Sequence, residues 1–159
     1  MTLLAPRTLL TALALTLASA AFAADTAPSA AAAPDKFSAA RAQIADGKWM
    51  AAIEELKRIN EPGDADWNNL MGYSHRKAKV PDYAAAERFY NAALQIDPKH
   101  RGALEYSGEL YLMLGDLTRA EQRLSALDKA CFLPCDEFTD LKNAVQRYKA
   151  NGGKYVAAR

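Results

Sequence analysis

The sequence predicts an all-α protein built from a repeated pair of helices. Apolar residues recur at intervals of three and four positions through most of the chain, as they do along one face of a helix. Runs of valine, isoleucine and threonine that would indicate strands are missing. A short pattern also returns: a turn dipeptide, an apolar residue, and an alanine three positions later. Its alanines, Ala52, Ala86 and Ala120, follow one another at intervals of 34 residues, which indicates a repeat.

Each repeat unit is expected to hold two amphipathic helices. The first helices are predicted at residues 36–46, 65–79 and 101–114, and the second helices at 48–59, 82–95 and 116–130. Residues 61–64 (EPGD) and 97–98 (DP) separate the units, because proline and glycine interrupt helices and aspartate favours helix starts. The repeated alanines lie where the two helices of a unit cross, and their small side chains let the helices approach closely.

A further helix is predicted at residues 136–150, where it would cover the apolar flank that a three-unit array leaves open. Its apolar stripe consists of Phe138, Leu141, Ala144, Val145 and Tyr148. The sequence Asn151-Gly152-Gly153 should end this helix, since these residues tolerate the left-handed backbone conformation. Residues 151–159 are then expected to form a loose tail.

The N-terminus has the pattern of a secretory signal peptide. Arg7 is followed by the uncharged apolar run 8–22, and Ala21-Phe22-Ala23 offers the small residues that signal peptidase requires. We therefore expect a signal peptide at residues 1–23, a flexible Ala/Pro-rich linker at 24–35, and a periplasmic or secreted protein. The alternative is a membrane anchor, but the run is shorter than the ~20 apolar residues that a spanning helix needs. No stable membrane anchor is expected after cleavage.

The charge balance argues against nucleic acid as a partner. The chain has 20 Lys+Arg and 19 Asp+Glu, so loss of Arg7 with the signal peptide leaves the mature chain formally neutral. A neutral chain provides no general attraction for nucleic acids or acidic membranes.

Catalysis and metal binding also find no support in the sequence. No Ser-His-Asp order, His-Glu-x-x-His motif or glycine-rich phosphate loop is present. The two histidines fall on separate elements, His75 where it should be half-buried and His100 at a helix start where it should be exposed. We therefore expect no enzyme activity, no catalytic residues, no metal and no cofactor.

These units resemble the tetratricopeptide repeat, a helix–turn–helix unit of 34 residues. The middle unit carries the family's residues most fully, at Met71-Gly72, Tyr83, Ala86, Tyr90, Ala93 and Pro98. The third unit matches at Ser107-Gly108, Tyr111 and Ala120, while the first has Ala40 in place of the family's glycine. Residues 80–81 read as an insertion in the turn of the middle unit. The resemblance implies a right-handed α-solenoid over residues 36–150, with repeats at about 33–64, 65–100 and 101–134 and the cap helix 136–150.

The resemblance also implies that the first helices line a concave groove that binds a protein or peptide partner. The groove positions carried over from the family are Arg41, Asp66, Asn69, Tyr73, Arg76, Lys77, Glu105, Glu109, Leu112 and Met113. Arg76 and Lys77 would receive a carboxylate of the partner, whereas Glu105 and Glu109, one turn apart, would favour basic partner residues. In the alternative interpretation these charges only solvate a helix face.

One kind of groove is excluded, and other questions about partners stay open. The lysine and asparagine clamp by which some tetratricopeptide domains hold chaperone C-termini is absent, because Leu70, Gly102 and Tyr106 stand at its positions. The residues do not specify the partner, and a homo-oligomer through exposed end helices remains open.

The two cysteines, Cys131 and Cys135, enclose Phe132-Leu133-Pro134. In an oxidising compartment such a pair most often forms a disulfide. Residues four apart on a continuous helix have Cβ atoms ~5–6 Å apart, but a disulfide requires about 3.8 Å, so the helix must break. Pro134 provides that break, and we predict a disulfide at the corner between the last repeat and the cap helix.

The alternative function for this pair is a thiol-redox or copper-handling accessory protein. Redox motifs usually place two residues between the cysteines in a strand–helix fold, and here there are three in an all-helical chain. Two thiolates can bind copper(I), but no methionine or histidine lies nearby in sequence to complete the site.

Overall fold

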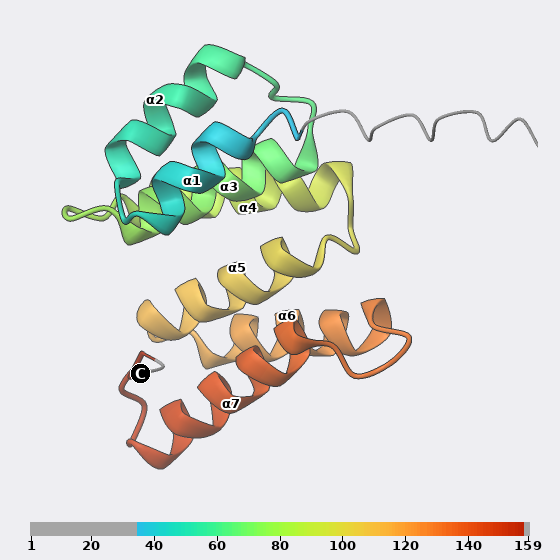
Figure 1. Ribbon diagram of the computed structural model, residues 1–159. Coiled ribbons are helices and arrows are strands. Elements are labelled where there is room, and N and C mark those ends of the chain that lie inside the picture. Colours follow the sequence, from blue (N-terminus) through green and yellow to red (C-terminus); the bar gives the residue numbers. More distant parts are fainter. Residues whose placement is uncertain (1–34, 158–159) are drawn as a thin grey trace, which may run out of the picture. The chain divides into compact units, whose positions relative to one another are not determined.

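The computed structural model describes residues 35–157, which form seven helices and no strand (Figure 1). The helices are α1 (Ser38–Ala45), α2 (Trp49–Ile59), α3 (Ala65–Lys77), α4 (Tyr83–Ile96), α5 (Arg101–Met113), α6 (Leu117–Ala130) and α7 (Asp136–Ala150). Their ends agree with the predicted helices to within two residues. The predicted signal peptide, and the linker as far as residue 34, lie outside the described residues.

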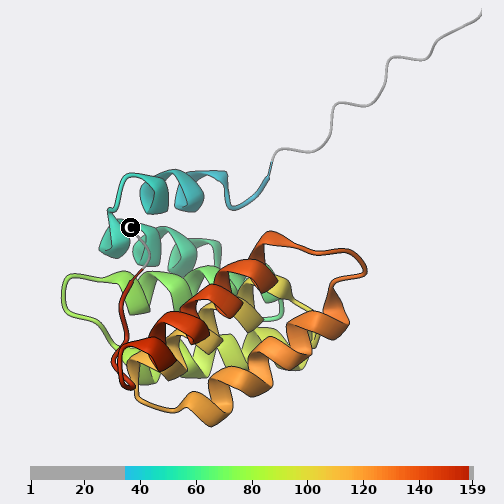
Figure 2. The ribbon, with the colours of Figure 1, turned by 90° about the horizontal axis from the view of Figure 1, so that it is seen from below.

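The helices pack as successive antiparallel pairs. Helix α1 packs on α2, α3 on α4 and α5 on α6, and each pair contacts the next through α2–α3 and α4–α5. The first helices also contact one another, α1 with α3 and α3 with α5, and α7 completes this row beside α5 (Figure 2). Residues 35–157 are therefore an all-α helical-repeat solenoid, as predicted. The turn in the middle unit spans residues 78–82, two residues longer than the turns at 46–48 and 114–116, which confirms the insertion.

Aspartate side chains cap the starts of three helices. The carboxylates of Asp64, Asp82 and Asp116 accept hydrogen bonds from backbone N–H groups in the first turns of α3, α4 and α6, at 3.1, 2.8 and 2.9 Å. Such caps satisfy N–H groups that have no partner within the helix. Before α2 and α6 the chain turns through Gly47 and Gly115, whose φ angles of 70° and 80° favour glycine. In the second and third units, the aspartate of the turn dipeptide therefore caps the helix that follows.

Small residues set the closeness of the helix pairs. The repeat alanines Ala52, Ala86 and Ala120 are fully buried. Gly72 faces the ring of Tyr90 on α4, and a Cβ at Gly72 would lie 2.8 Å from that ring. A Cβ at Gly108 would lie 2.5 Å from a methyl carbon of Leu141 on α7. Gly72 and Gly108 therefore lie where helices touch, and a side chain at either position would clash with the neighbouring helix.

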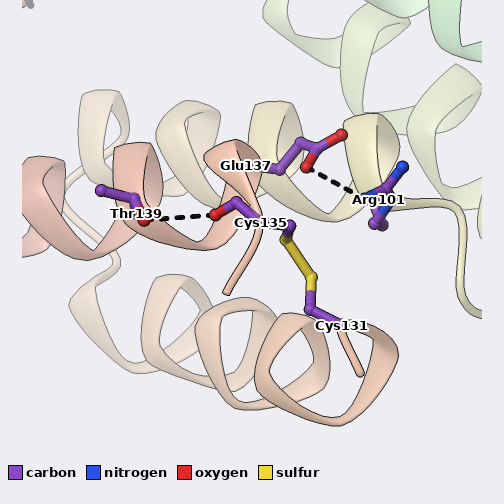
Figure 3. The surroundings of a disulfide bond; sticks show 5 residues. All are labelled: Arg101, Cys131, Cys135, Glu137 and Thr139. Carbon is purple, nitrogen blue, oxygen red and sulfur yellow. Dashed lines mark hydrogen bonds and ion pairs between the residues drawn. A yellow bond between two sulfur atoms is a disulfide. The ribbon is translucent and has the colours of Figure 1, made fainter. Parts of the chain in front are cut away.

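The corner between α6 and α7 has the predicted disulfide (Figure 3). Helix α6 ends at Ala130, the bonded Cys131 and Cys135 follow it, and α7 begins at Asp136. The carbonyl of Cys135 accepts a hydrogen bond from the Thr139 hydroxyl at 3.2 Å. Beyond this corner the predicted apolar stripe packs on α5 and α6, with Leu141, Ala144, Val145 and Tyr148 buried and Phe138 partly buried. The disulfide thus joins the last repeat to its cap.

Candidate functional site

Two adjoining hollows lie along the row of first helices, and together they are called the groove here. The larger is a cleft of about 350 Å³ lined by Tyr73, Arg76, Lys77, Glu105, Tyr106, Glu109, Met113, Asp140, Arg147, Tyr155 and Ala157. The smaller, of about 250 Å³, is lined by Arg41, Ile44, Asn69, Leu70, Tyr73 and Tyr106. Tyr73 and Tyr106 line both hollows, so these two rings stand between them. Eight of the ten predicted groove residues line one hollow or the other.

Leu112 is not a groove residue, and this prediction was wrong. Its side chain is only 1 % exposed and belongs to the core that α7 closes, together with Leu141 and Tyr148. On α5, Leu112 lies beyond Glu105 on the side that turns toward α7. Because α7 packs directly against α5, that side of α5 is covered and Leu112 does not reach the groove.

Asp66 lines neither hollow and instead connects three helices. Its carboxylate accepts a hydrogen bond from Arg41 of α1 at 3.0 Å and contacts Nε2 of His100 at 2.9 Å. The other ring nitrogen of His100, Nδ1, accepts a hydrogen bond from the N–H of Ala103, so the ring proton must sit on Nε2 and be donated to Asp66.

Asp66 therefore has a structural role at the start of α5. His100, whose side chain is 12 % exposed, is an N-cap in contact with this carboxylate rather than the exposed residue we expected. His75 is half-buried as expected, and it stacks on Phe89.

Arg76 is not an open receptor for a partner's carboxylate, contrary to the prediction. Its side chain is 3 % exposed, and the guanidinium donates to Oε2 of Glu109 at 2.7 Å. The same guanidinium lies 5.4 Å from the centres of the Tyr73 and Tyr106 rings. Arg76 and Glu109 therefore neutralise each other across the groove floor. Of the predicted basic pair, Lys77 stays exposed, with its ammonium 6.0 Å from the ring of Trp49.

Aromatic rings form the middle of the groove. Tyr73 of α3 and Tyr106 of α5 lie with their ring centres 4.7 Å apart, and Trp49 contacts Tyr73 edge-on. Tyr106 was not among the predicted groove residues. From the sequence alone it was identified only as a residue that replaces one of the chaperone-clamp positions. Helical spacing could have found it, because Tyr106 lies three residues before Glu109 and seven before Met113, on the same face of α5. Burial raises the pKa of Tyr106 to about 12, so its hydroxyl stays protonated and can donate.

Glu105 is a buried acidic residue of the groove without a partner of its own in the described part of the chain. The residue is 8 % exposed, and within residues 35–157 its carboxylate has neither an ion pair nor a hydrogen bond of its own. Burial raises its pKa to about 8, with further contributions from the negative charges of Glu109, Asp140 and Glu137, while Arg76 acts in the opposite direction. Glu105 is therefore largely protonated at neutral pH.

The segment after α7 also contributes to the groove, although we expected a loose tail. Gly152 and Gly153, with φ angles of 64° and 80°, end α7 and reverse the chain (Figure 2). Tyr155 then lies half-buried, packed on the core that α7 closes, and lines the larger hollow together with Arg76 and Glu109. The part of the tail that the structure describes therefore forms a wall of the groove.

The remaining predictions concern metal, catalysis and the membrane. In residues 35–157 no three His, Cys, Asp or Glu side chains are gathered so that they could hold a metal ion. Both cysteines are in the disulfide, and beside it Phe132 is 99 % exposed. None of the helices in this part of the chain has the length and apolar character of a membrane span.

Comparison with known proteins gives a family and two curated relatives. Residues 81–130 match the family model of the tetratricopeptide repeat. The chain is similar to the BBSome complex member BBS4 of Bos taurus, with 32 % identity over 106 residues, 64 % of this chain and 19 % of that protein. It is also similar to the BBSome complex member BBS4 of Mus musculus, with 30 % identity over 116 residues, 70 % of this chain and 21 % of that protein. The chain thus spans about a fifth of the length of these relatives. No solved structure matches.

Proposed function

We propose that this chain, a tetratricopeptide-repeat protein, binds another protein by holding an extended segment of it in the groove. The observation that carries the proposal is the larger hollow, where Tyr73 and Tyr106 stand beside ionisable groups of three helices. Aromatic rings give a large contact area at low conformational cost, and the polar groups around them give orientation. The relatives support the same class of function, since they are named as members of a complex.

We assign this function to the periplasm or the cell exterior, because the N-terminus has the pattern of a signal peptide. The Cys131–Cys135 disulfide supports this assignment, since disulfides form and persist in oxidising compartments. N-terminal sequencing of the protein purified from its own envelope fraction tests the proposal. We expect the mature chain to begin at Ala24, and a chain that retains residues 1–23 would contradict it.

The thiol-redox or copper-handling function is the weaker proposal. A disulfide sulfur does not offer the thiolate that nucleophilic exchange and copper binding require. This function would need a reduced pair, and mass spectrometry of the native protein with and without alkylation measures the fraction that is reduced.

Capture of the partner tests the groove. The Tyr73→Ala, Lys77→Glu double variant changes one ring and one exposed cation of the groove, and it leaves the Arg76–Glu109 pair in place. A matched variant, Tyr83→Ala with Lys79→Glu, removes the same groups beyond the residues that line the groove. Crosslinking in the native compartment followed by affinity capture should recover the partner with the wild type and the matched variant, but not with the groove variant. Equal recovery with all three proteins, each shown by circular dichroism to be folded, would refute this use of the groove.

A further inference from the structure

Glu105 is buried in the groove under conditions that favour a cation beside it. A carboxylate that leaves water without a partner is costly, and it takes up a proton when no cation is available. Arg76 is the cation that lowers the pKa of Glu105, but its guanidinium donates to Glu109 at 2.7 Å. The other charges that act on Glu105 are all acidic: Glu109, and Glu137 and Asp140 of α7. Glu137 is paired with Arg101 at 3.6 Å, so Asp140 is, among the described residues, the unpaired one of the two on α7.

Charge is distributed unevenly along the larger hollow. Helices α5 and α7 run in the same direction, since Arg101 pairs with Glu137 near their starts and Gly115 lies beside Tyr148 near their ends. Glu105 and Asp140 belong to the starts of these helices, whereas Lys77 ends α3 and Arg147 lies near the end of α7. The hollow therefore has an acidic end at Glu105 and a basic end at Lys77 and Arg147.

We propose that Glu105 binds the lysine or arginine side chain of the partner segment, with Asp140 supporting it from α7. This inference rests on the proposed function, because it names the residue type that the groove selects. The incoming cation restores the charged form of Glu105 and pairs with it in a partly desolvated site, where such contacts are stronger than on the surface. Tyr73 and Tyr106, which line the same hollow, provide the apolar wall for the stem of the side chain.

Proton release on binding follows from this geometry. Free Glu105 is protonated below its pKa of about 8, and only the ionised form attracts the cation. The affinity should therefore rise with pH, roughly tenfold per unit while the pH is well below the pKa of Glu105. Lysine itself stays charged throughout, because its ordinary pKa is about 10.4.

Three synthetic peptides test the proposal by NMR titration of the purified protein. They are acetylated and amidated and share one alanine–tyrosine sequence, but their central residue is lysine, norleucine or glutamate. We expect the lysine peptide to shift the groove resonances most strongly, and its affinity to rise with pH as stated. The Glu105→Gln variant should lose both the preference for lysine and the pH dependence. Glu54→Gln, on the outer helix α2, is the matched control and should keep both.

The proposal is overturned if the norleucine peptide binds as well as the lysine peptide. It is equally overturned if Glu105→Gln keeps the preference, or if none of the peptides binds at millimolar concentration. These failures differ from a failure of the proposed function. The capture experiment could find a partner whose binding depends on the groove but whose bound segment has no basic residue. That result would support the proposed function and contradict the role of Glu105.

Discussion

The guanidinium of Arg76 and the carboxylate of Glu109 meet at 2.7 Å across α3 and α5, with the Arg76 side chain 3 % exposed. The two residues are 33 positions apart and belong to the first helices of successive repeats. Because this ion pair neutralises a cation and an anion at the groove floor, the charges that remain in the larger hollow are those of Glu105, Asp140, Lys77 and Arg147. The pair also ties the second repeat to the third.

Removal of Glu109 should destabilise the protein strongly. Glu109→Met leaves Arg76 charged and buried without its partner, and breaking a buried pair in this way costs about 3 kcal/mol of unfolding free energy. Urea denaturation measures the loss. The exposed pair of Lys48 with Asp46 is the control, and Asp46→Ala should cost about 0.5 kcal/mol or less. Equal losses in the two variants would show that Arg76 does not depend on Glu109.

Gly108→Ala should weaken the attachment of α7. The new Cβ would lie 2.5 Å from a methyl carbon of Leu141, which is fully buried. Either the Leu141 side chain or α7 must therefore shift, which lowers the unfolding free energy by about 1–3 kcal/mol. Gly63→Ala is the control, because nothing lies within 4 Å of the position that its Cβ would take and its φ is ordinary. Thermal unfolding distinguishes the two. Adding Leu141→Val to Gly108→Ala should recover part of the lost stability. If it recovers none, the destabilisation does not come from a clash with Leu141.

Glu105→Gln should stabilise the protein at neutral and alkaline pH. The pKa of Glu105 is raised to about 8 in the folded protein from its ordinary value of about 4.3 in the unfolded chain. Between these values the folded state holds a proton that the unfolded state lacks, so stability falls as pH rises. The slope for this residue is about 1.4 kcal/mol per pH unit.

Denaturation of the wild type and of Glu105→Gln between about pH 5 and pH 8 isolates this contribution as the difference between the two curves. Other groups, including His75 with its lowered pKa, cancel in that difference. A constant difference across the range would mean that Glu105 has an ordinary pKa.

Loss of the Cys131–Cys135 disulfide should cost about 2 kcal/mol, because the closed loop is short and the entropy it removes from the unfolded chain is small. The effect should be local to α7. Hydrogen exchange of amides in α7 should accelerate in the Cys131→Ser, Cys135→Ser variant more than exchange in α3 and α4. Reductant should lower the stability of the wild type and leave that of the double variant unchanged. A double variant as stable as the oxidised wild type would show that the disulfide does not stabilise the fold.

The repeat period, the ends of the helices and the corner disulfide could be predicted from the sequence, because each depends on local signals. Turn glycines, aspartate caps and apolar spacing act over a few residues, and Pro134 breaks the helix between the two cysteines. The family resemblance added the positions of the groove, and most of those residues do line it.

The chemistry of the groove was decided only by the tertiary structure. Whether Arg76 is open or paired depends on Glu109 in another repeat, and Leu112 is hidden because α7 packs beside α5. Tyr155 reaches the same hollow through a chain reversal after α7. The sequence determined which residues face the first-helix row, because a helix has a fixed period. Burial, pairing and the raised pKa of Glu105 arise between helices, and only the packed array determines them.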